Sequence, residues 1–381
     1  MPALTTVLSL SISTLVILIL KRYFTYYRFQ IISGSNKLHD IVANSDIYRN
    51  QIRPPIHCVS GTLHTLHGSK TKAPALAWKR FYVKDEEDDV FAIDELLDTP
   101  PPIKSNYTLP SSLAPLRSNA PVLLLLHSMG GSARERPVRR MAYQARMQGF
   151  RCFCLIVRGC GNTKLNKPNF RGLAGVDYRD LDCAVKYLKK QYQTNLYVCG
   201  FSLGSMLLLN FLTRSKEATS DLIAGAVAAY TTFDASIGLR LSPKQQTFFG
   251  KLLIPFIKNN YDVLKQIKEI KVDKVLQEKT LISFDANITA PAIGFDSPSS
   301  YYNALSQGTF EYLHRVSVPL LLYVTQDDPV TGPHCPDVKA HISDNIVLVK
   351  ASEGGHLGSV VRNSNQDVFS SLAVDFMSEL L

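Results

Sequence analysis

The sequence predicts an α/β fold with a mostly parallel central sheet and helices on both faces, and three observations support this prediction. Continuous apolar runs of strand length alternate with longer amphipathic segments over most of the chain. Runs that are apolar throughout are typical of strands covered on both faces. A serine flanked by glycines at 200–204 stands between a strand-like run and a helix-like run. An acidic loop and a histidine-bearing loop follow two late apolar runs, at the sheet edge where such folds place their chemistry.

The first 120 residues contain the elements expected before the main alternation. Residues 30–72 are mixed and polar. A hairpin is predicted from the apolar arms 76–83 and 90–93, which are joined by an acidic turn. Residues 98–119 are rich in Pro and Ser and are expected to form a surface loop.

Beyond residue 120 the apolar periodicity predicts alternating strands and helices. The expected strands are 122–126, 152–157, 195–199, 224–230, 318–324 and 346–349, and the expected helices are 139–148, 178–191 and 206–212. The segment from about 235 to 310 interrupts this alternation, and a helix is expected within it at 253–270. We interpret the segment as a helical cap insertion whose apolar side chains suit an acyl chain; packing on the core accounts for any single one equally well.

Composition limits the class of protein. The chain has 381 residues, 45% of them hydrophobic and 19% charged, enough for one large globular domain and an appendage. The net charge of +10 could indicate nucleic acid or an anionic membrane surface. Without a compact Lys/Arg block or a nucleic-acid motif, we favour the membrane, or no specific meaning, and expect no nucleic-acid partner. The 7 cysteines include no C-x-x-C pair, so we expect no disulfide framework, metal site or cofactor.

The N-terminus predicts a membrane anchor. Residues 3–20 carry no charge, and Lys21 and Arg22 follow at once. About 18 apolar residues suffice to cross a bilayer. A cleaved signal peptide is the alternative, but the basic residues follow the apolar run instead of preceding it. We therefore expect an anchor at 3–20, a juxtamembrane segment at 21–60 and the globular domain at 61–381. The expected location is the endoplasmic reticulum or another endomembrane, with the globular domain on the cytosolic side.

Ser202 is the candidate nucleophile. A serine between two glycines, placed between a strand and a helix, is typical of a nucleophile elbow. Its hydroxyl is a weak nucleophile at neutral pH and needs a base held in place by an acid. In folds with such an elbow the acid and the histidine follow the serine in that order.

The candidate acid and base lie in the loops after the last two predicted strands. Asp327 and Asp328 follow one strand, and we expect Asp328 to be the acid and Asp327 to brace the loop. Such a pair beside a proline is also ordinary turn chemistry. His356 lies among glycines after the last strand and is the expected base.

An oxyanion hole requires backbone N–H groups aimed at the developing negative charge. We expect one from Leu203, directly after the nucleophile, and one from Met129, in the glycine-containing loop after the first long strand. Arg158 is expected to brace the site loops through hydrogen bonds, and Cys160 is not placed as a nucleophile.

Together these motifs resemble the AB hydrolase 4 family of α/β-hydrolases. The resemblance rests on the segments 61–65, 127–131, 158–165, 200–204, 284–289 with its continuation to 302, 326–329 and 353–358. It implies an α/β-hydrolase fold, a Ser202–Asp328–His356 triad and an N-terminal membrane helix. It also implies hydrolysis of carboxylic esters of short- to medium-chain acyl lipids, such as acylglycerols or phospholipids.

Two features of the sequence bear on how far this resemblance reaches. Ser128 stands where the family has glycine, and its β-carbon could narrow the oxyanion hole. No histidine is followed five residues on by aspartate, which disfavours, without excluding, acyl transfer to an alcohol. A serine peptidase and a non-catalytic lipid-binding or receptor protein on the same scaffold also stay open. Of the sequons at Asn106 and Asn287, a glycan on Asn106 would contradict the cytosolic location.

Overall fold

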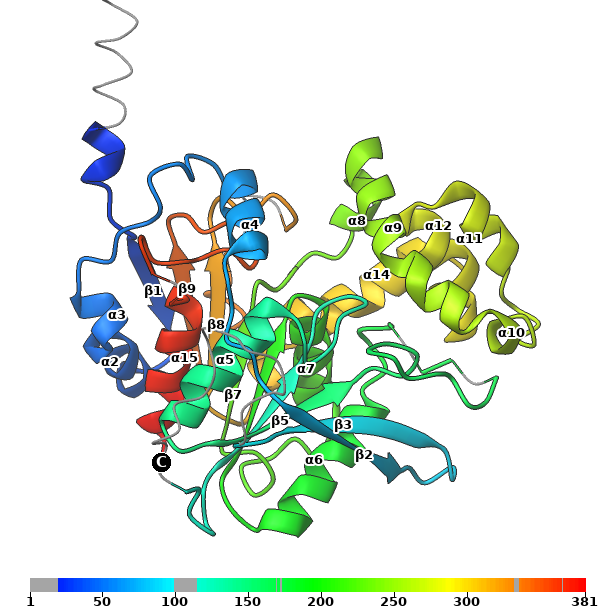
Figure 1. Cartoon of the computed structure of the whole chain (residues 1–381), viewed down its shortest axis with the longest axis horizontal. Coiled ribbons are helices and arrows are strands. Elements are labelled where there is room, and N and C mark those ends of the chain that lie inside the picture. Colours follow the sequence, from blue (N-terminus) through cyan, green and yellow to red (C-terminus); the bar gives the residue numbers. More distant parts are fainter. Residues whose placement is uncertain (1–19, 99–114, 169, 172, 332–335, 365) are drawn as a thin grey trace, which may run out of the picture.

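A mixed sheet forms the centre of the molecule (Figure 1). The computed structural model describes residues 20–98, 115–168, 170–171, 173–331, 336–364 and 366–381. Within these residues the sheet has nine strands in the order β1-β9-β8-β7-β6-β4-β5-β3-β2. The parallel strands are β4 (Val122–Leu126), β5 (Arg151–Ile156), β6 (Leu196–Phe201), β7 (Gly225–Ala229), β8 (Leu320–Thr325) and β9 (Ile346–Ala351).

Helices cover both faces of this sheet, as predicted. One face packs against α5 (Arg136–Met147) and α15 (Val368–Ser378), and the other against α6 (Arg179–Tyr192) and α7 (Leu203–Arg214). Every residue of β4, β6, β7 and β8 is buried, which explains why these strands are apolar throughout. The expected alternation of strands and helices, and with it the α/β class, is therefore confirmed.

The two edges of the sheet are antiparallel. The predicted hairpin is present as β2 (Trp78–Lys84) and β3 (Val90–Leu96), and β3 pairs with β5. At the opposite edge, β1 (Phe29–Ser33) pairs with β9.

The predicted juxtamembrane segment 21–60 is part of the fold, which corrects the boundary expected at residue 61. Besides β1 it contains α2 (Asn36–Asn44) and α3 (Asp46–Arg49), and Leu38 and Val42 enter the core on the α5–α15 face. The short α4 (Gly61–Lys70) follows. The edge strand β1 has five residues and is held by backbone hydrogen bonds to its one neighbour, β9. Such pairing does not depend on apolar side chains, so no long apolar run marks the strand in the sequence.

The expected anchor at 3–20 lies outside the described residues except for Leu20, and Asn106 lies outside them as well. Among the residues that are described, we find no helix with the length and apolarity needed to span a bilayer.

The segment between β7 and β8 forms a group of helices beside the carboxyl ends of the strands (Figure 1). Its members are α8 (Ile237–Arg240), α9 (Pro243–Asn259), α10 (Tyr261–Leu264), α11 (Val272–Glu278), α12 (Leu281–Phe284), η1 (Asp285–Thr289), α13 (Ala290–Ala292), α14 (Pro298–Ser306), η2 (Gln307–Glu311) and η3 (Leu313–Arg315). Phe256, Ile257, Phe284 and Ile288 form a core within this group, together with residues of the loop after β5.

The helix predicted at 253–270 has other limits in the structure, so the prediction is wrong at both ends. α9 begins ten residues earlier, at Pro243. Ser242, directly before it, caps the helix and forms a capping box with Gln245. The helix ends at Asn259, and the side chain of Asn260 there donates to the carbonyl of Gly159 and accepts from the amide of Leu165. Those long-range bonds decide where the helix stops.

Candidate active site

Ser202 occupies a strained turn between β6 and α7. Its backbone angles are φ 52° and ψ −115°, a region that residues with a β-carbon rarely adopt. The flanking glycines make the turn possible. A β-carbon on Gly200 would lie 2.4 Å from the carbonyl oxygen of Gly204, and one on Gly204 would lie 2.5 Å from that of Leu126. The elbow expected from the sequence is therefore present, and it holds the hydroxyl at the edge of the sheet.

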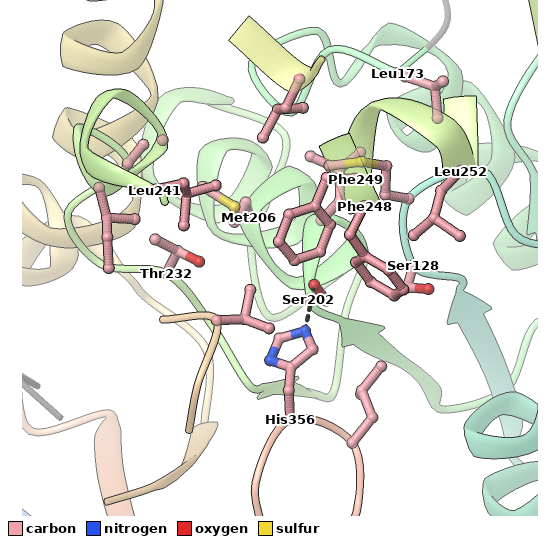
Figure 2. Close-up of a pocket in the computed structure, with 18 of the residues that line it drawn as sticks. Ser128, Leu173, Ser202, Met206, Thr232, Leu241, Phe248, Phe249, Leu252 and His356 are labelled. Atoms are coloured by element: carbon pink, nitrogen blue, oxygen red, sulfur yellow. Dashed lines mark hydrogen bonds between the residues drawn. The ribbon is translucent and has the colours of Figure 1, made fainter. Parts of the chain in front are cut away.

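The three candidate triad residues lie in hydrogen-bond contact. Nε2 of His356 is 2.9 Å from Oγ of Ser202 (Figure 2). Nδ1 of the same ring is 2.8 Å from Oδ2 of Asp328. Because the carboxylate accepts a hydrogen bond from Nδ1–H, Nε2 is left unprotonated and can take the hydroxyl proton of Ser202. The other carboxylate oxygen of Asp328 accepts the amides of Val330 at 2.7 Å and Thr331 at 3.1 Å.

The environment of Asp328 favours its ionised form. Burial alone would raise its pKa, but the charge and hydrogen bond of His356 and the two loop amides hold the pKa below its usual range. Its stabilising contribution is present above the unfolded pKa and is lost as the pH falls through the folded pKa. Asp328 is therefore a charged orienting group for His356 at neutral pH.

Asp327 has a different role from its neighbour. Its Oδ1 accepts the amide of Gly355 at 2.8 Å, next to the histidine. Burial raises the pKa of Asp327, and the hydrogen bond from Gly355 opposes that shift. This hydrogen bond joins the acid loop to the histidine loop.

Helix α4 supports the same loop, which sequence reasoning missed. Thr65 Oγ1 accepts the amide of His356 at 2.8 Å and donates to the carbonyl of Gly61 at 2.8 Å. A β-carbon on Gly61 would lie 1.5 Å from the carbonyl oxygen of Asp327, so the helix begins directly against the acid loop. The family-like segment 61–65 was the available signal.

The loop after β4 carries the expected oxyanion-hole residue Met129. Nε2 of His127 accepts the amide of Val157 at 3.1 Å, so Nδ1 carries the proton and donates to the carbonyl of Ser128 at 2.7 Å. Burial lowers the pKa of His127, which keeps this buried ring neutral. In the part of the chain that the structure describes, the amides of Met129 and Leu203 donate no hydrogen bond, and both residues line one cavity with Ser202.

Ser128 is tied to Glu135, at the start of α5. Its hydroxyl donates to Oε1 at 2.7 Å and its amide to Oε2 at 3.0 Å. The serine that replaces the family glycine thus has a partner that fixes its rotamer. The same carboxylate engages the Ser128 amide.

The cavity above Ser202 has a volume of about 410 Å³ and a largely apolar wall. Its size lies within the range of small-molecule sites in proteins. The apolar side chains around it include Leu173, Met206, Leu241, Phe248, Phe249 and Leu252 (Figure 2). Most of them come from α8 and α9 and their surroundings, so the insertion covers the nucleophile with hydrocarbon.

Two acidic residues line the cavity, Glu135, which is paired with Ser128, and Asp285. Asp285, in η1, is buried and accepts a hydrogen bond from the hydroxyl of Tyr302 at 2.5 Å. Burial raises the pKa of Asp285 to about 6, with the Tyr302 hydrogen bond acting in the opposite direction. Sequence reasoning assigned Asp285 no role, because nothing in the linear pattern shows that this carboxyl reaches the cavity.

Arg158 and Cys160 lie behind the site. Arg158 is buried and makes ion pairs with Asp85, Asp89 and Asp180, which join the β2–β3 turn to the start of α6. Its bracing role therefore acts mainly on the hairpin. Cys160 is buried in the helical insertion core, and burial raises the pKa of its thiol to about 12, so it is not a nucleophile.

The fold and the nucleophile elbow define an α/β hydrolase. Comparison with known proteins agrees: residues 121–264 match the family described as alpha/beta hydrolase fold. The relatives found are of the AB hydrolase 4 type, so the resemblance predicted from the sequence is confirmed.

Three relatives illustrate the similarity. Monoacylglycerol lipase of Saccharomyces cerevisiae is 25% identical over 62% of this chain and 54% of its own length. Human phospholipase ABHD3 is 26% identical over 63% and 59%. Medium-chain fatty acid ethyl ester synthase/esterase 2 of Saccharomyces cerevisiae is 25% identical over 72% and 66%. The matched region thus spans little more than half the length of the first two relatives.

Replacing Asp285 by asparagine should raise the stability of the protein at alkaline pH. The folded pKa is about 6 against an ordinary value of 3.8, so the buried carboxyl costs stability increasingly as the pH rises through this window. The difference corresponds to about 3 kcal/mol between the limits. We expect Asp285→Asn to gain stability relative to wild type on going from about pH 4.5 to about pH 8, measured by urea unfolding.

The matched control is Asp273→Asn, at an exposed carboxyl in the same insertion. Equal stability differences between Asp285→Asn and wild type at both pH values would show that Asp285 is not the titrating group.

Proposed function

We propose that the protein is a serine hydrolase that cleaves carboxylic esters of short- to medium-chain acyl lipids. One observation carries this proposal. A chain of hydrogen bonds runs from Asp328 through His356 to Ser202, and Ser202 lies at the floor of an apolar cavity. A serine activated in this way is suited to attack a carbonyl, and hydrocarbon walls are suited to an acyl chain.

The proposed reaction has two halves. Ser202 Oγ attacks the ester carbonyl while His356 Nε2 takes the hydroxyl proton, and Asp328 stabilises the imidazolium. The amides of Met129 and Leu203 stabilise the oxyanion, and the carbon–oxygen bond to the alcohol breaks as His356 returns the proton to it. Water then attacks the acyl-enzyme, with His356 as base, and the acid is released.

The proposed substrate class follows from the cavity. Its apolar side chains contact the acyl chain, and the carboxyl of Asp285 with the hydroxyl of Tyr302 offers hydrogen bonds to a polar alcohol part such as glycerol. The names of the relatives, which include a monoacylglycerol lipase and a phospholipase, support a glycerolipid ester. The name ethyl ester synthase/esterase supports transfer of the same acyl group to an alcohol as the second candidate reaction.

We also propose that the enzyme works at a membrane, anchored by residues 3–20 with the domain in the cytosol. The described chain starts at Leu20, on the side of the molecule where α4 and α8 lie (Figure 1). Exposed apolar side chains gather on these elements beside the cavity: Val59, Leu63 and Leu66 at or in α4, Leu239 in α8, and Phe248 and Leu252 in α9. Contact of this surface with a bilayer would place the cavity next to lipid.

Loss of the Ser202 hydroxyl should abolish covalent labelling by a fluorophosphonate probe. The probe reacts only with an activated serine, so we expect the folded wild-type protein to be labelled and Ser202→Ala to be blank. Hydrolysis of a short-chain p-nitrophenyl ester should fall more than about a thousandfold in the variant. Ester hydrolysis retained in Ser202→Ala would sink the assignment, whereas an unlabelled but folded wild type would favour a lipid-binding protein.

The two neighbouring aspartates provide a matched pair of variants. Asp328→Asn should lower kcat by roughly 10²- to 10⁴-fold, because asparagine cannot stabilise the imidazolium. Asp327 accepts the amide of Gly355, and Asp327→Asn removes only the charge of the accepting side chain. This variant should therefore lower kcat by no more than about tenfold. Steady-state kinetics on one soluble ester will rank them, and the reverse order would exchange their roles.

Membrane contact can be tested without touching the cavity, because Leu66 and Leu239 are exposed and do not line it. The Leu66→Ser, Leu239→Ser double variant should lose about tenfold of its activity on esters embedded in phospholipid vesicles and keep its activity on a soluble ester. Tyr82→Ser, at an exposed aromatic in β2, is the control. Equal losses on both substrates, or none on vesicles, would contradict the membrane-facing surface.

A further inference from the structure

A group of three potential metal ligands lies outside the cavity, at the base of α4. The ring nitrogens of His57 and His67 and the sulfur of Cys58 lie within 4.8 Å of one another. Nε2 of His57 is 3.0 Å from Nδ1 of His67, and the two rings meet edge to face with centroids 4.6 Å apart. None of the three residues lines the cavity above Ser202.

The local fold brings these side chains together. His57 and Cys58 lie in the loop before α4, and His67 lies in the last turn of that helix. Ser60 caps the helix by accepting the amide of Leu63, which turns the chain back on itself. The amide of Cys58 donates to the carbonyl of Pro55 at 3.1 Å, so the backbone that carries the thiol is held in place.

We propose that His57, Cys58 and His67 bind a Zn²⁺ ion. Two imidazoles and a thiolate are ligands that zinc prefers, and three protein ligands leave the fourth tetrahedral position for water. His57 is exposed, so solvent has access to the group. Ligand distances of about 2.0–2.1 Å to nitrogen and about 2.3 Å to sulfur in a tetrahedral site require the three atoms to be about 3.3–3.6 Å apart. The three atoms lie within 4.8 Å of one another, and the exposed side chain of His57 leaves room for adjustment to this spacing.

The charges around the group are mixed. The guanidinium of Arg22 donates to the carbonyls of Pro55 and Cys58, and that of Arg140 donates to the carbonyls of Gly68 and Thr71, at the end of α4. The carboxylate of Glu353 pairs with Arg22 at 2.6 Å and offsets one of these cations. The coordinated thiol loses its proton to solvent, which removes one more positive charge from the complex.

A bound ion would join the loop before α4 to the last turn of the helix. The same helix carries Thr65, which accepts the amide of the catalytic candidate His356. Zinc would therefore restrain the helix on which the histidine loop rests. Zinc binding itself is independent of the proposed ester hydrolysis, and its test uses no substrate.

The test is metal titration of the full chain in detergent micelles after treatment with a chelator. With zinc chloride followed by calorimetry, we expect one ion per chain bound with a Kd tighter than about 10 µM. With cobalt chloride, a thiolate-to-metal charge-transfer band should appear in the near ultraviolet, since Co²⁺ enters the same ligand set. The affinity should fall at least about tenfold in Cys58→Ser and in His67→Asn.

His57→Ala provides a variant at an exposed ring and should also weaken binding about tenfold without loss of folding, checked by circular dichroism. Cys183→Ser and His39→Ala are the controls, because both change a side chain of the same kind that does not belong to this group. Weak binding, or affinity and cobalt spectra that survive all three ligand substitutions, would overturn the proposal and mark the contact between His57 and His67 as a plain hydrogen bond.

Discussion

The close approach of backbone to backbone at the nucleophile elbow is the constraint on which the rest of the site depends. Gly200 and Gly204 leave no space for a β-carbon, and only this closeness lets Ser202 adopt its strained turn. The turn needs a rigid support, which the buried strands β4 and β6 supply. It also sets the start of α7, and with it the position of the amide of Leu203 beside the hydroxyl.

The histidine loop is positioned by a second set of contacts that come from distant parts of the chain. Thr65 holds the amide of His356, Asp327 holds the amide of Gly355, and Gly61 allows α4 to begin directly against the acid loop. Single hydrogen bonds are weak in net terms, but several of them on one loop restrict its conformations. The N-terminal part of the chain thus contributes to the site although it supplies no reacting atom.

The parts that sequence reasoning predicted share a physical cause. Strands buried on both faces must be apolar throughout, so β4, β6 and β8 leave unmistakable runs. Ser202, Asp328 and His356 could be named because each lies in a loop directly after such a run. The edge strand β1 and the C-terminal end of α9 could not, because backbone pairing with β9 and the long-range bonds of Asn260 define them.

The sequence alone therefore determined the α/β class, the order of the central elements and the candidate triad, because burial and turn geometry act on residues that are neighbours in the chain. Tertiary structure alone decided that Ser128 pairs with Glu135 and that Asp285 reaches the cavity. It also brought His57 and Cys58 to His67. This group contains a single cysteine, so no C-x-x-C pair marks it in the sequence. These contacts depend on distances between side chains on separate turns, and no periodicity in the sequence encodes such distances.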